Sequence, residues 1–147
     1  DVMAIVHNHS PTVIPFSVTD TPLRPMFHLG AIIGSELPVW DIRDNFQDTN
    51  MLVTNMEQGR DLAACLGGRR VSLMRGHGCV IAGQTIREVV MASVYLQVNA
   101  GLLLQSLQLG EVKYLSPGEI EMMSDSQMRL TGQERAWEYW ANRAGRG

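Results

Sequence analysis

Three of the four histidines in this chain stand where they could bind one metal ion. His7 and His9 flank Asn8, and because side chains alternate along a strand, two residues at this spacing point to the same face. A neutral imidazole offers a nitrogen lone pair, a common ligand for zinc and similar divalent ions. For the His-x-His pair alone, two ordinary surface or core histidines explain the pattern equally well.

His77 strengthens the case for a metal site. It lies between Gly76 and Gly78, and glycines allow the backbone to turn sharply and to approach another strand closely. Three protein ligands with an open position are typical of catalytic rather than structural zinc sites. We therefore predict a divalent-metal site made of these three histidines. Cys79 could compete as a ligand, but its place in an apolar strand favours a packed thiol.

Three further residues are candidates for substrate binding. Arg75 and Arg43 could bind a carboxylate or a phosphate group, although structural pairing with a nearby aspartate explains them equally well. His28 could face the site, but a histidine between two apolar residues is more often packed and hydrogen-bonded. The sequence contains no G-x-S-x-G, Walker or complete dinucleotide-binding motif.

The elements that position these residues can be predicted from local patterns. Residues 2–9, 71–74 and 79–82 read as strands, and 75–78 as a turn between two of them. Thr54 with Glu57 predicts one helix start, and Thr85 with Glu88 predicts the start of a long apolar helix that ends before Gly110. Interleaved strands and helices indicate an α/β class with a helix-covered sheet.

Length, net charge and composition limit the classes of protein to which this chain can belong. A chain of 147 residues fits one domain, 1–147, of which residues 120–147 are expected to form a helical tail. The net charge of −3 provides no basic surface for nucleic acid. Two cysteines without a secretory signal suggest a reducing, cytoplasmic setting. Residues 89–109 carry no charge, but six polar residues interrupt the run, so a buried helix of a soluble protein is expected rather than a membrane span.

The chain enters a strand almost at once. Asp1 is followed directly by β-rich residues, with no initiator methionine and no positively charged leader. We therefore expect the sequence to be truncated at its N-terminus, within a domain.

Several motifs together resemble the class II aldolase/adducin family. They are His7-Asn8-His9-Ser10-Pro11, Pro25-x-x-His28, Gly34-x-x-x-Pro38-Val39, the Arg75-Gly76-His77-Gly78 turn and the long helix after it. Their order and intervals match from residue 1 to about residue 120. Adducin-type members have typically lost the histidine set, so its presence here favours an enzyme.

The resemblance implies a three-layer α/β/α fold with a mainly antiparallel sheet, in a homotetramer with active sites at subunit interfaces. It implies that His7, His9 and His77 bind a divalent ion, zinc or manganese. Such an ion would hold vicinal oxygens of a small-molecule substrate and stabilise the negative charge left when a carbon–carbon bond breaks. Aldol cleavage, epimerisation and decarboxylation all use this chemistry in the family.

Two departures from the family pattern affect the choice of reaction. The family's catalytic glutamate and phosphate-binding loop precede the His-x-His motif, so the catalytic base is expected upstream of Asp1 and no residue of this chain is assigned to it. Fuculose-phosphate aldolases carry a tyrosine proton donor where this chain has Leu29. The segments 21–28 and 41–44 look more like a decarboxylase-related branch, which includes a hydroxy-methylpyridine-dicarboxylate decarboxylase.

The expected function is therefore a metal-dependent carbon–carbon lyase, a decarboxylase or an aldolase. A sugar-phosphate aldolase or epimerase and a non-catalytic adducin-like binding module are the alternatives. A purely structural metal site is a third, and it would require a fourth protein ligand.

Overall fold

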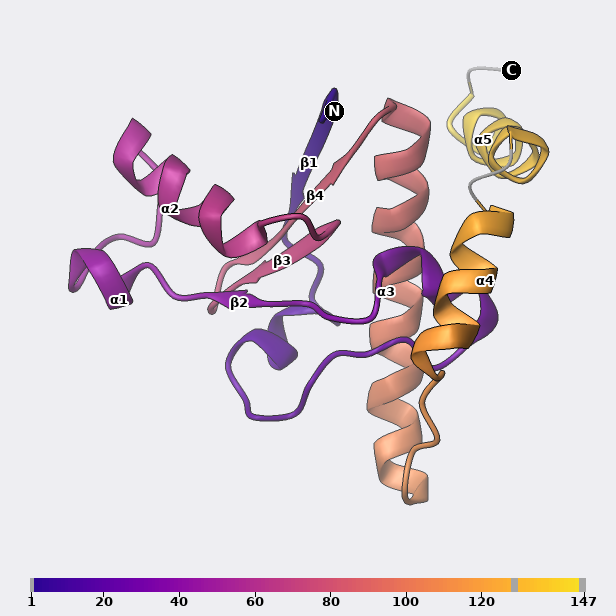
Figure 1. Cartoon of the computed structure of the whole chain (residues 1–147), viewed down its shortest axis with the longest axis horizontal. Helices are drawn as coiled ribbons and strands as arrows, with labels where there is room; N and C mark the ends of the chain where they lie inside the picture. Colours follow the sequence, from indigo (N-terminus) through magenta and orange to yellow (C-terminus); the bar gives the residue numbers. More distant parts are fainter. Residues whose placement is uncertain (1, 128–129, 146–147) are drawn as a thin grey trace.

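Four short strands form one open sheet in the order β1-β4-β3-β2 (Figure 1). β4 pairs antiparallel with both β1 and β3, whereas β2 pairs parallel with β3, which confirms the prediction of a mainly antiparallel sheet. The computed structural model describes residues 2–127 and 130–145. Its strands are β1 (Ala4–Asn8), β2 (Val39–Trp40), β3 (Val71–Met74) and β4 (Gly78–Gly83).

Alternation along the strands gives the sheet two covered faces. Val71 and Leu73 of β3 belong to the main buried cluster, which includes apolar residues of the long helix α3 (Ile86–Leu109). Met74 faces the opposite side, in a second cluster with Trp40 and Ile42 against which the helix α2 (Met56–Leu66) packs. Helices on both faces of one sheet make the three-layer α/β/α fold that the sequence predicted (Figure 1).

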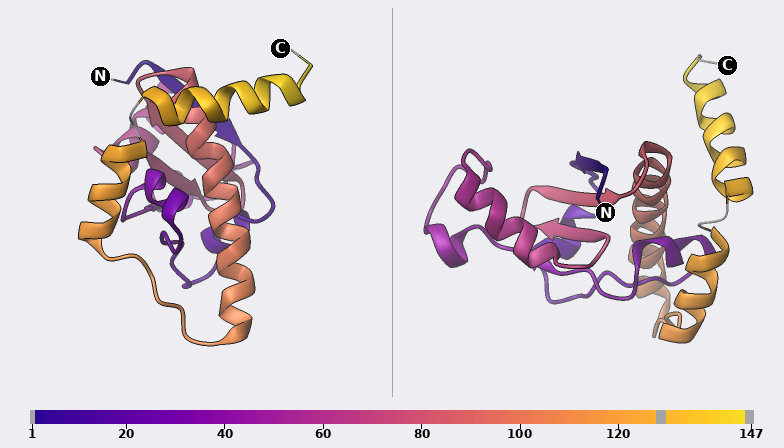
Figure 2. Two further views of the ribbon diagram at one scale, coloured as in Figure 1. Left: turned by 90° about the vertical axis from the view of Figure 1, so that its right-hand side faces the viewer. Right: turned by 45° about the horizontal axis from the view of Figure 1, so that its top comes forward.

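The remaining elements are short helices and a helical end. Two 3-10 helices, η1 (Ile14–Ser17) and η2 (His28–Ile33), lie in the proline-rich segment, and α1 (Arg43–Phe46) follows β2. The helices α4 (Pro117–Gln127) and α5 (Leu130–Arg143) close the chain. α5 lies across the N-terminal half of α3 (Figure 2), where the rings of Tyr95 and Trp140 are 5.8 Å apart.

α3 is the central helix of the domain. Thr85 accepts a hydrogen bond from the Glu88 N–H over 3.1 Å, so the predicted start is confirmed, and Gly110 ends the helix as expected. α3 is long and apolar enough to cross a membrane by length and composition. Its buried side chains recur every three or four residues, as in Val89, Ala92 and Leu96, and they pack on the sheet. This pattern is that of a core helix.

The start of α2 differs from the prediction by one residue. Asn55 rather than Thr54 is the N-cap, and its side chain accepts a hydrogen bond from the Gln58 N–H over 3.0 Å. The Gln58 side chain in turn accepts from the Thr54 N–H over 2.8 Å. Asparagine caps helices as well as threonine does, so the helix can begin after Asn55, with Gln58, rather than after Thr54, with Glu57.

Candidate metal centre

The fold brings His7, His9 and His77 together on the face of the sheet that α2 covers. Their ring centroids lie 4.8 Å apart for His7 and His9, 4.9 Å for His7 and His77, and 4.7 Å for His9 and His77. One ligand nitrogen from each residue lies within 4.8 Å of the others. Three imidazoles at this separation can converge on one divalent cation.

Hydrogen bonding orients the first imidazole. His7 Nδ1 lies 3.0 Å from the carbonyl oxygen of Cys79. Because a carbonyl only accepts, Nδ1 must carry the proton, which leaves the lone pair on Nε2. That Nε2 lies 2.9 Å from Nε2 of His9 and so accepts a hydrogen bond from it, which directs the lone pair of His7 into the cluster. A backbone carbonyl behind a ligating histidine is the usual means of orienting it.

The surroundings of His77 favour its neutral form. Burial lowers its pKa, and the neighbouring imidazoles of His7 and His9 lower it further, while the backbone of Met51 acts in the opposite direction. Its Nδ1 is buried and has no hydrogen-bond partner among the described residues. A neutral imidazole is the form that binds a divalent cation, so this environment fits the requirements of a metal ligand.

Two glycines let the turn between β3 and β4 present His77. Gly76 has a φ of +64°, a left-handed conformation that favours glycine. At Gly78, an added Cβ would lie 2.2 Å from the carbonyl oxygen of Asn8 and 3.1 Å from Cδ2 of His9. The absence of a side chain at Gly78 therefore allows β4 to approach the strand that carries the other two histidines.

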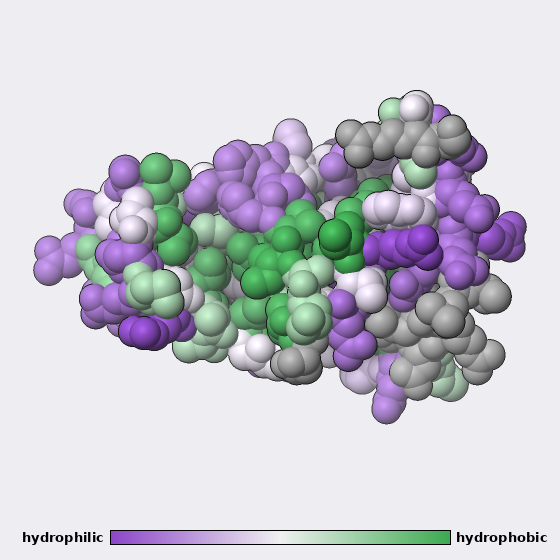
Figure 3. Space-filling model, turned by 90° about the horizontal axis from the view of Figure 1, so that it is seen from above, coloured by the Kyte–Doolittle hydropathy of each residue, from purple (hydrophilic) through white to green (hydrophobic). Residues whose placement is uncertain are grey.

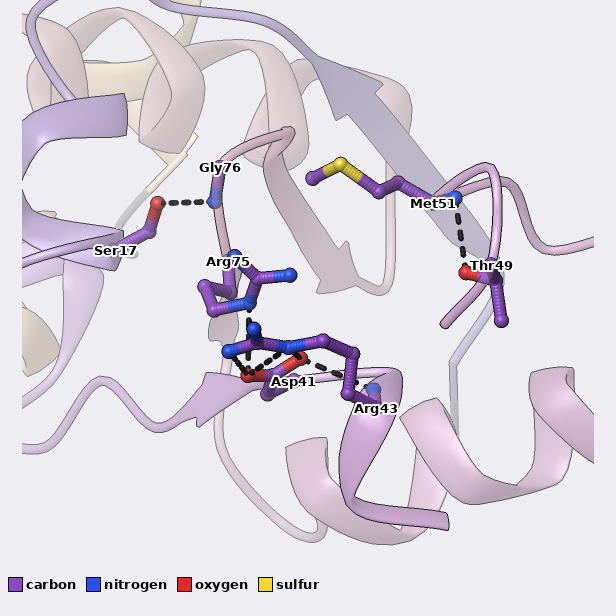
Figure 4. A network of polar contacts seen from close by, with 7 residues as sticks. All are labelled: Ser17, Asp41, Arg43, Thr49, Met51, Arg75 and Gly76. Atoms are coloured by element: carbon purple, nitrogen blue, oxygen red, sulfur yellow. Dashed lines mark hydrogen bonds and ion pairs between the residues drawn. The ribbon is translucent and has the colours of Figure 1, made fainter. Parts of the chain in front are cut away.

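The other side of this turn is attached to two distant segments. The Gly76 N–H donates a hydrogen bond to Oγ of Ser17, at the end of η1, over 2.9 Å (Figure 4). Arg75 Nε lies 2.7 Å from Oδ2 of Asp41, just after β2. Ser17 and Asp41 thus hold the two residues that precede His77. No local pattern in the sequence pointed to Ser17, because its partner lies far away in the chain.

Arg43 and Arg75 share one carboxylate. Arg43 Nη2 donates to Oδ2 of Asp41 over 2.7 Å, and its Nε lies 3.2 Å from both carboxylate oxygens (Figure 4). The Arg43 hydrogen bonds, with Arg75 adding to them, lower the pKa of Asp41 well below its usual range although its burial acts against them. The structure thus gives both arginines the structural pairing that was one of the two explanations. Substrate binding by either arginine stays a prediction.

His28 belongs to a different part of the molecule. It begins η2, which packs against α3 and α4. The segment before it is anchored by Asn99 of α3, whose side chain accepts from the Met26 N–H over 3.0 Å and donates to the Arg24 carbonyl over 2.9 Å. His28 does not line the cavity beside the three histidines. Its predicted substrate-binding role remains untested.

A cavity of about 490 Å³ adjoins the three histidines. The rest of its lining comes from the loop before α2, from α2 itself and from β3 and β4, and consists of Leu52, Val53, Thr54, Leu62, Met74 and Val80. Among the described residues, the histidine cluster includes no carboxylate and no cysteine. Cys79 faces the main core and its thiol donates to Oδ1 of Asn8 over 3.4 Å, so it is a packed residue.

The likeness to known proteins extends over most of the chain. The decarboxylase tropJ of Talaromyces stipitatus is 28% identical over 160 residues, covering 95% of this chain and 60% of the relative. A 5-methylthioribulose-1-phosphate/5-deoxyribulose-1-phosphate aldolase of Rhodospirillum rubrum is 26% identical over 121 residues, covering 82% of this chain and 52% of that protein. The chain thus spans between half and three-fifths of the length of these relatives.

A structural superposition and a family profile point to the same family as these relatives. An L-fuculose 1-phosphate aldolase superposes with a TM-score of 0.69 at 21% identity, over 86% of this chain and 56% of the other, and so shares the fold. The profile described as "Class II Aldolase and Adducin N-terminal domain" matches residues 1–104. The family predicted from the motifs is therefore confirmed, and the chain belongs to the class II aldolase and adducin family.

Proposed function

We propose that this chain carries the metal centre of a divalent-metal-dependent carbon–carbon lyase. The observation that supports it is the convergence of His7, His9 and His77, with their ligand nitrogens within 4.8 Å of one another beside an open cavity. Members of this family typically depend on a divalent metal, and zinc or manganese suits an all-imidazole set. A bound ion would act as a Lewis acid on substrate oxygens next to the bond that breaks.

The residues of the chain prepare the site for this role. The Cys79 carbonyl orients His7, and burial lowers the pKa of His77, which favours the neutral form that binds a cation. The three histidines leave coordination positions for two oxygens of a hydroxy-carbonyl or hydroxy-carboxylate substrate. We assign no catalytic base within this chain.

Among the reactions of the family, we favour decarboxylation. A relative that covers 95% of the chain is named a decarboxylase, and Leu29 stands where the resemblance places the tyrosine proton donor of fuculose-phosphate aldolases. A leucine cannot donate a proton. Sugar-phosphate aldol cleavage is the alternative, supported by the aldolase relative from Rhodospirillum rubrum. Release of carbon dioxide rather than an aldehyde would distinguish the two.

We further propose that residues 1–147 belong to one domain of a cytoplasmic protein. We also propose that this protein is a homotetramer with the metal site near a subunit interface. Several apolar side chains are left uncovered, among them Met3 (81% exposed) just before β1, Ile5 (67%) on β1, and Val98 and Leu102 on α3. Seen from above, apolar surface spreads over the middle of the molecule between two hydrophilic ends (Figure 3). Light scattering, which measures the mass of the assembly, tests this arrangement. The variant Val98→Glu should form smaller assemblies than the wild type, because it places a charge in the proposed interface.

The decisive experiment on the metal centre measures metal content and turnover of the full-length protein. His9→Ala and His77→Ala should each abolish both, while His28→Ala should retain stoichiometric metal because His28 lies outside the cluster. Full activity of a metal-free His77→Ala protein would end the proposal. Wild-type protein that folds but contains no stoichiometric metal would favour an adducin-like binding module instead.

A further inference from the structure

His9 lies just beyond the strand that carries His7, so pairing with β4 does not fix its position. β1 ends at Asn8, and its pairing with β4 stops at the same residue, opposite Cys79. Two residues along a regular strand are separated by about 6.6 Å. The rings of His7 and His9 nevertheless lie 4.8 Å apart, with their Nε2 atoms at 2.9 Å. The two imidazoles therefore converge where the backbone ladder of the sheet has ended.

The side chain of Asn8 holds the chain at this point. Its Oδ1 accepts a hydrogen bond from the Ser10 N–H over 3.2 Å and a second one from the Cys79 thiol over 3.4 Å. The first bond closes a turn around His9, in which the asparagine side chain takes the place of a backbone carbonyl. The second bond attaches this turn to β4. Because a backbone N–H can only donate, the oxygen of the amide and not its nitrogen must face Ser10.

Cys79 connects this turn to the first histidine of the pair. Its carbonyl oxygen lies 3.0 Å from Nδ1 of His7, while its thiol donates to the Asn8 side chain. Cys79 is completely buried in the main core. The backbone of Asn8 lies so close to Gly78 that a Cβ added there would be 2.2 Å from the Asn8 carbonyl oxygen. β4 therefore fixes Asn8 through both its backbone and its side chain.

We propose that Asn8 is a positioning residue for the metal centre, and that its Oδ1 holds the turn that directs His9 into the cluster of three histidines. The inference rests on the proposed metal centre. Asn8 is not itself a ligand, since its side chain faces Cys79 in the main core and does not line the cavity beside the histidines. Without Oδ1, the N–H of buried Ser10 would lose its partner, and the direction of His9 from the end of β1 would be less well defined.

Metal binding by the full-length protein tests this role without measuring turnover. Asn8→Ala removes the acceptor and should lower zinc affinity, measured by competition with a chelator, by about tenfold to a hundredfold. Asn8→Asp keeps an oxygen in the same place and should retain the wild-type affinity within about threefold. With cobalt(II) in place of zinc, the visible absorption depends on the arrangement of the ligands. This spectrum should change in Asn8→Ala and stay the same in Asn8→Asp.

The matched control is Asn50→Ala. Asn50 makes the same kind of turn, with its Oδ1 accepting from the Leu52 N–H over 3.1 Å, but it lies in the loop before α2 and not at the end of β1. It should leave zinc affinity and the cobalt spectrum unchanged. If Asn8→Ala does not fold, Asn8→Ser replaces it, because a serine hydroxyl closes such turns more weakly and should give a smaller loss of zinc affinity.

The possible outcomes separate the positioning role from the metal centre. Wild-type zinc affinity and cobalt spectrum in the variant that lacks the amide, or an equal loss of affinity in Asn8→Asp, would overturn the role of Asn8 and leave the metal centre intact. A loss of unfolding free energy in Asn8→Ala with unchanged zinc affinity would show that Asn8 serves the fold and not the site. A wild-type protein that binds no zinc would overturn the metal centre and this inference with it.

Discussion

The hydroxyl of Ser17 accepts a hydrogen bond from the backbone N–H of Gly76 over 2.9 Å and donates one to the carbonyl oxygen of Ile14 over 2.7 Å. Ser17 is buried at the end of η1, and Gly76 immediately precedes His77. One side chain thus connects a 3-10 helix to the turn that presents the third histidine. Because outer groups of this kind set ligand orientation, we expect Ser17 to act as a positioning residue for the proposed metal centre.

Replacement of Ser17 by alanine should weaken metal binding. The Gly76 N–H would lose its partner, and the position of His77 would become less well defined. We expect zinc affinity to fall about tenfold and the free energy of unfolding to fall by about 1–2 kcal/mol. Competition with a chelator and denaturant titration measure the two effects. Thr19→Ala, which removes an exposed hydroxyl bound to the Pro15 carbonyl, is the control and should alter neither by much.

Substitution of Gly78 by alanine should disrupt the site more severely. The added methyl carbon would lie 2.2 Å from the Asn8 carbonyl oxygen, so β1 and β4 would have to separate at the point where His9 leaves the strand. We expect a loss of about 2–3 kcal/mol in unfolding free energy together with loss of bound metal. Gly118→Ala in α4, where nothing lies within 4 Å, should be neutral or slightly stabilising. A Gly78→Ala protein with wild-type stability and metal content would contradict the close approach of these strands.

The ion pair between buried Glu88 and partly exposed Arg70 should make the stability of the fold depend on pH. Burial alone would raise the pKa of Glu88, but the Arg70 guanidinium and the backbone N–H groups of Gln84 and Thr85 lower it overall. Ionised Glu88 therefore stabilises the fold above the ordinary pKa of 4.5, and this contribution disappears as the pH falls towards the lowered value.

Glu88→Gln is the variant that tests this dependence. It should cost about 3 kcal/mol at neutral pH and reduce the fall in stability below about pH 4.5. Denaturant titrations at several pH values measure both effects. Removing the exposed pair of Glu36 and Arg69 by Glu36→Gln should cost less than about 1 kcal/mol. Identical pH profiles for wild type and Glu88→Gln would show that the pair contributes no acid sensitivity.

The two cysteines should differ in reactivity. Burial raises the pKa of Cys79 to about 12, so almost none of it is thiolate near neutral pH, and its side chain is inaccessible. Cys65 is only partly buried. Iodoacetamide followed by peptide mass spectrometry should therefore label Cys65 in the folded protein and Cys79 only after unfolding. Rapid labelling of Cys79 under native conditions would show that β4 opens easily.

Local patterns in the sequence were enough to predict the elements that carry the site. The His-x-His spacing placed two imidazoles side by side at the end of β1, and the Thr85 cap and Gly110 correctly bounded α3. These predictions succeeded because strand alternation and helix capping depend on residues a few positions apart. Thr54 and Asn55 are both residues that can cap a helix, and the prediction of Thr54 as the N-cap of α2 was wrong.

Tertiary structure decided everything that depends on contacts between distant segments. Only folding pairs Arg43 and Arg75 with the same aspartate, brings Ser17 to Gly76 and separates His28 from the cavity. The apolar lining of the cavity is likewise invisible in the sequence, because Leu52 and Leu62 look like ordinary loop and helix residues until the sheet places Met74 and Val80 beside them. The sequence thus determined which groups could bind a metal, and the packing of the layers decided what surrounds it.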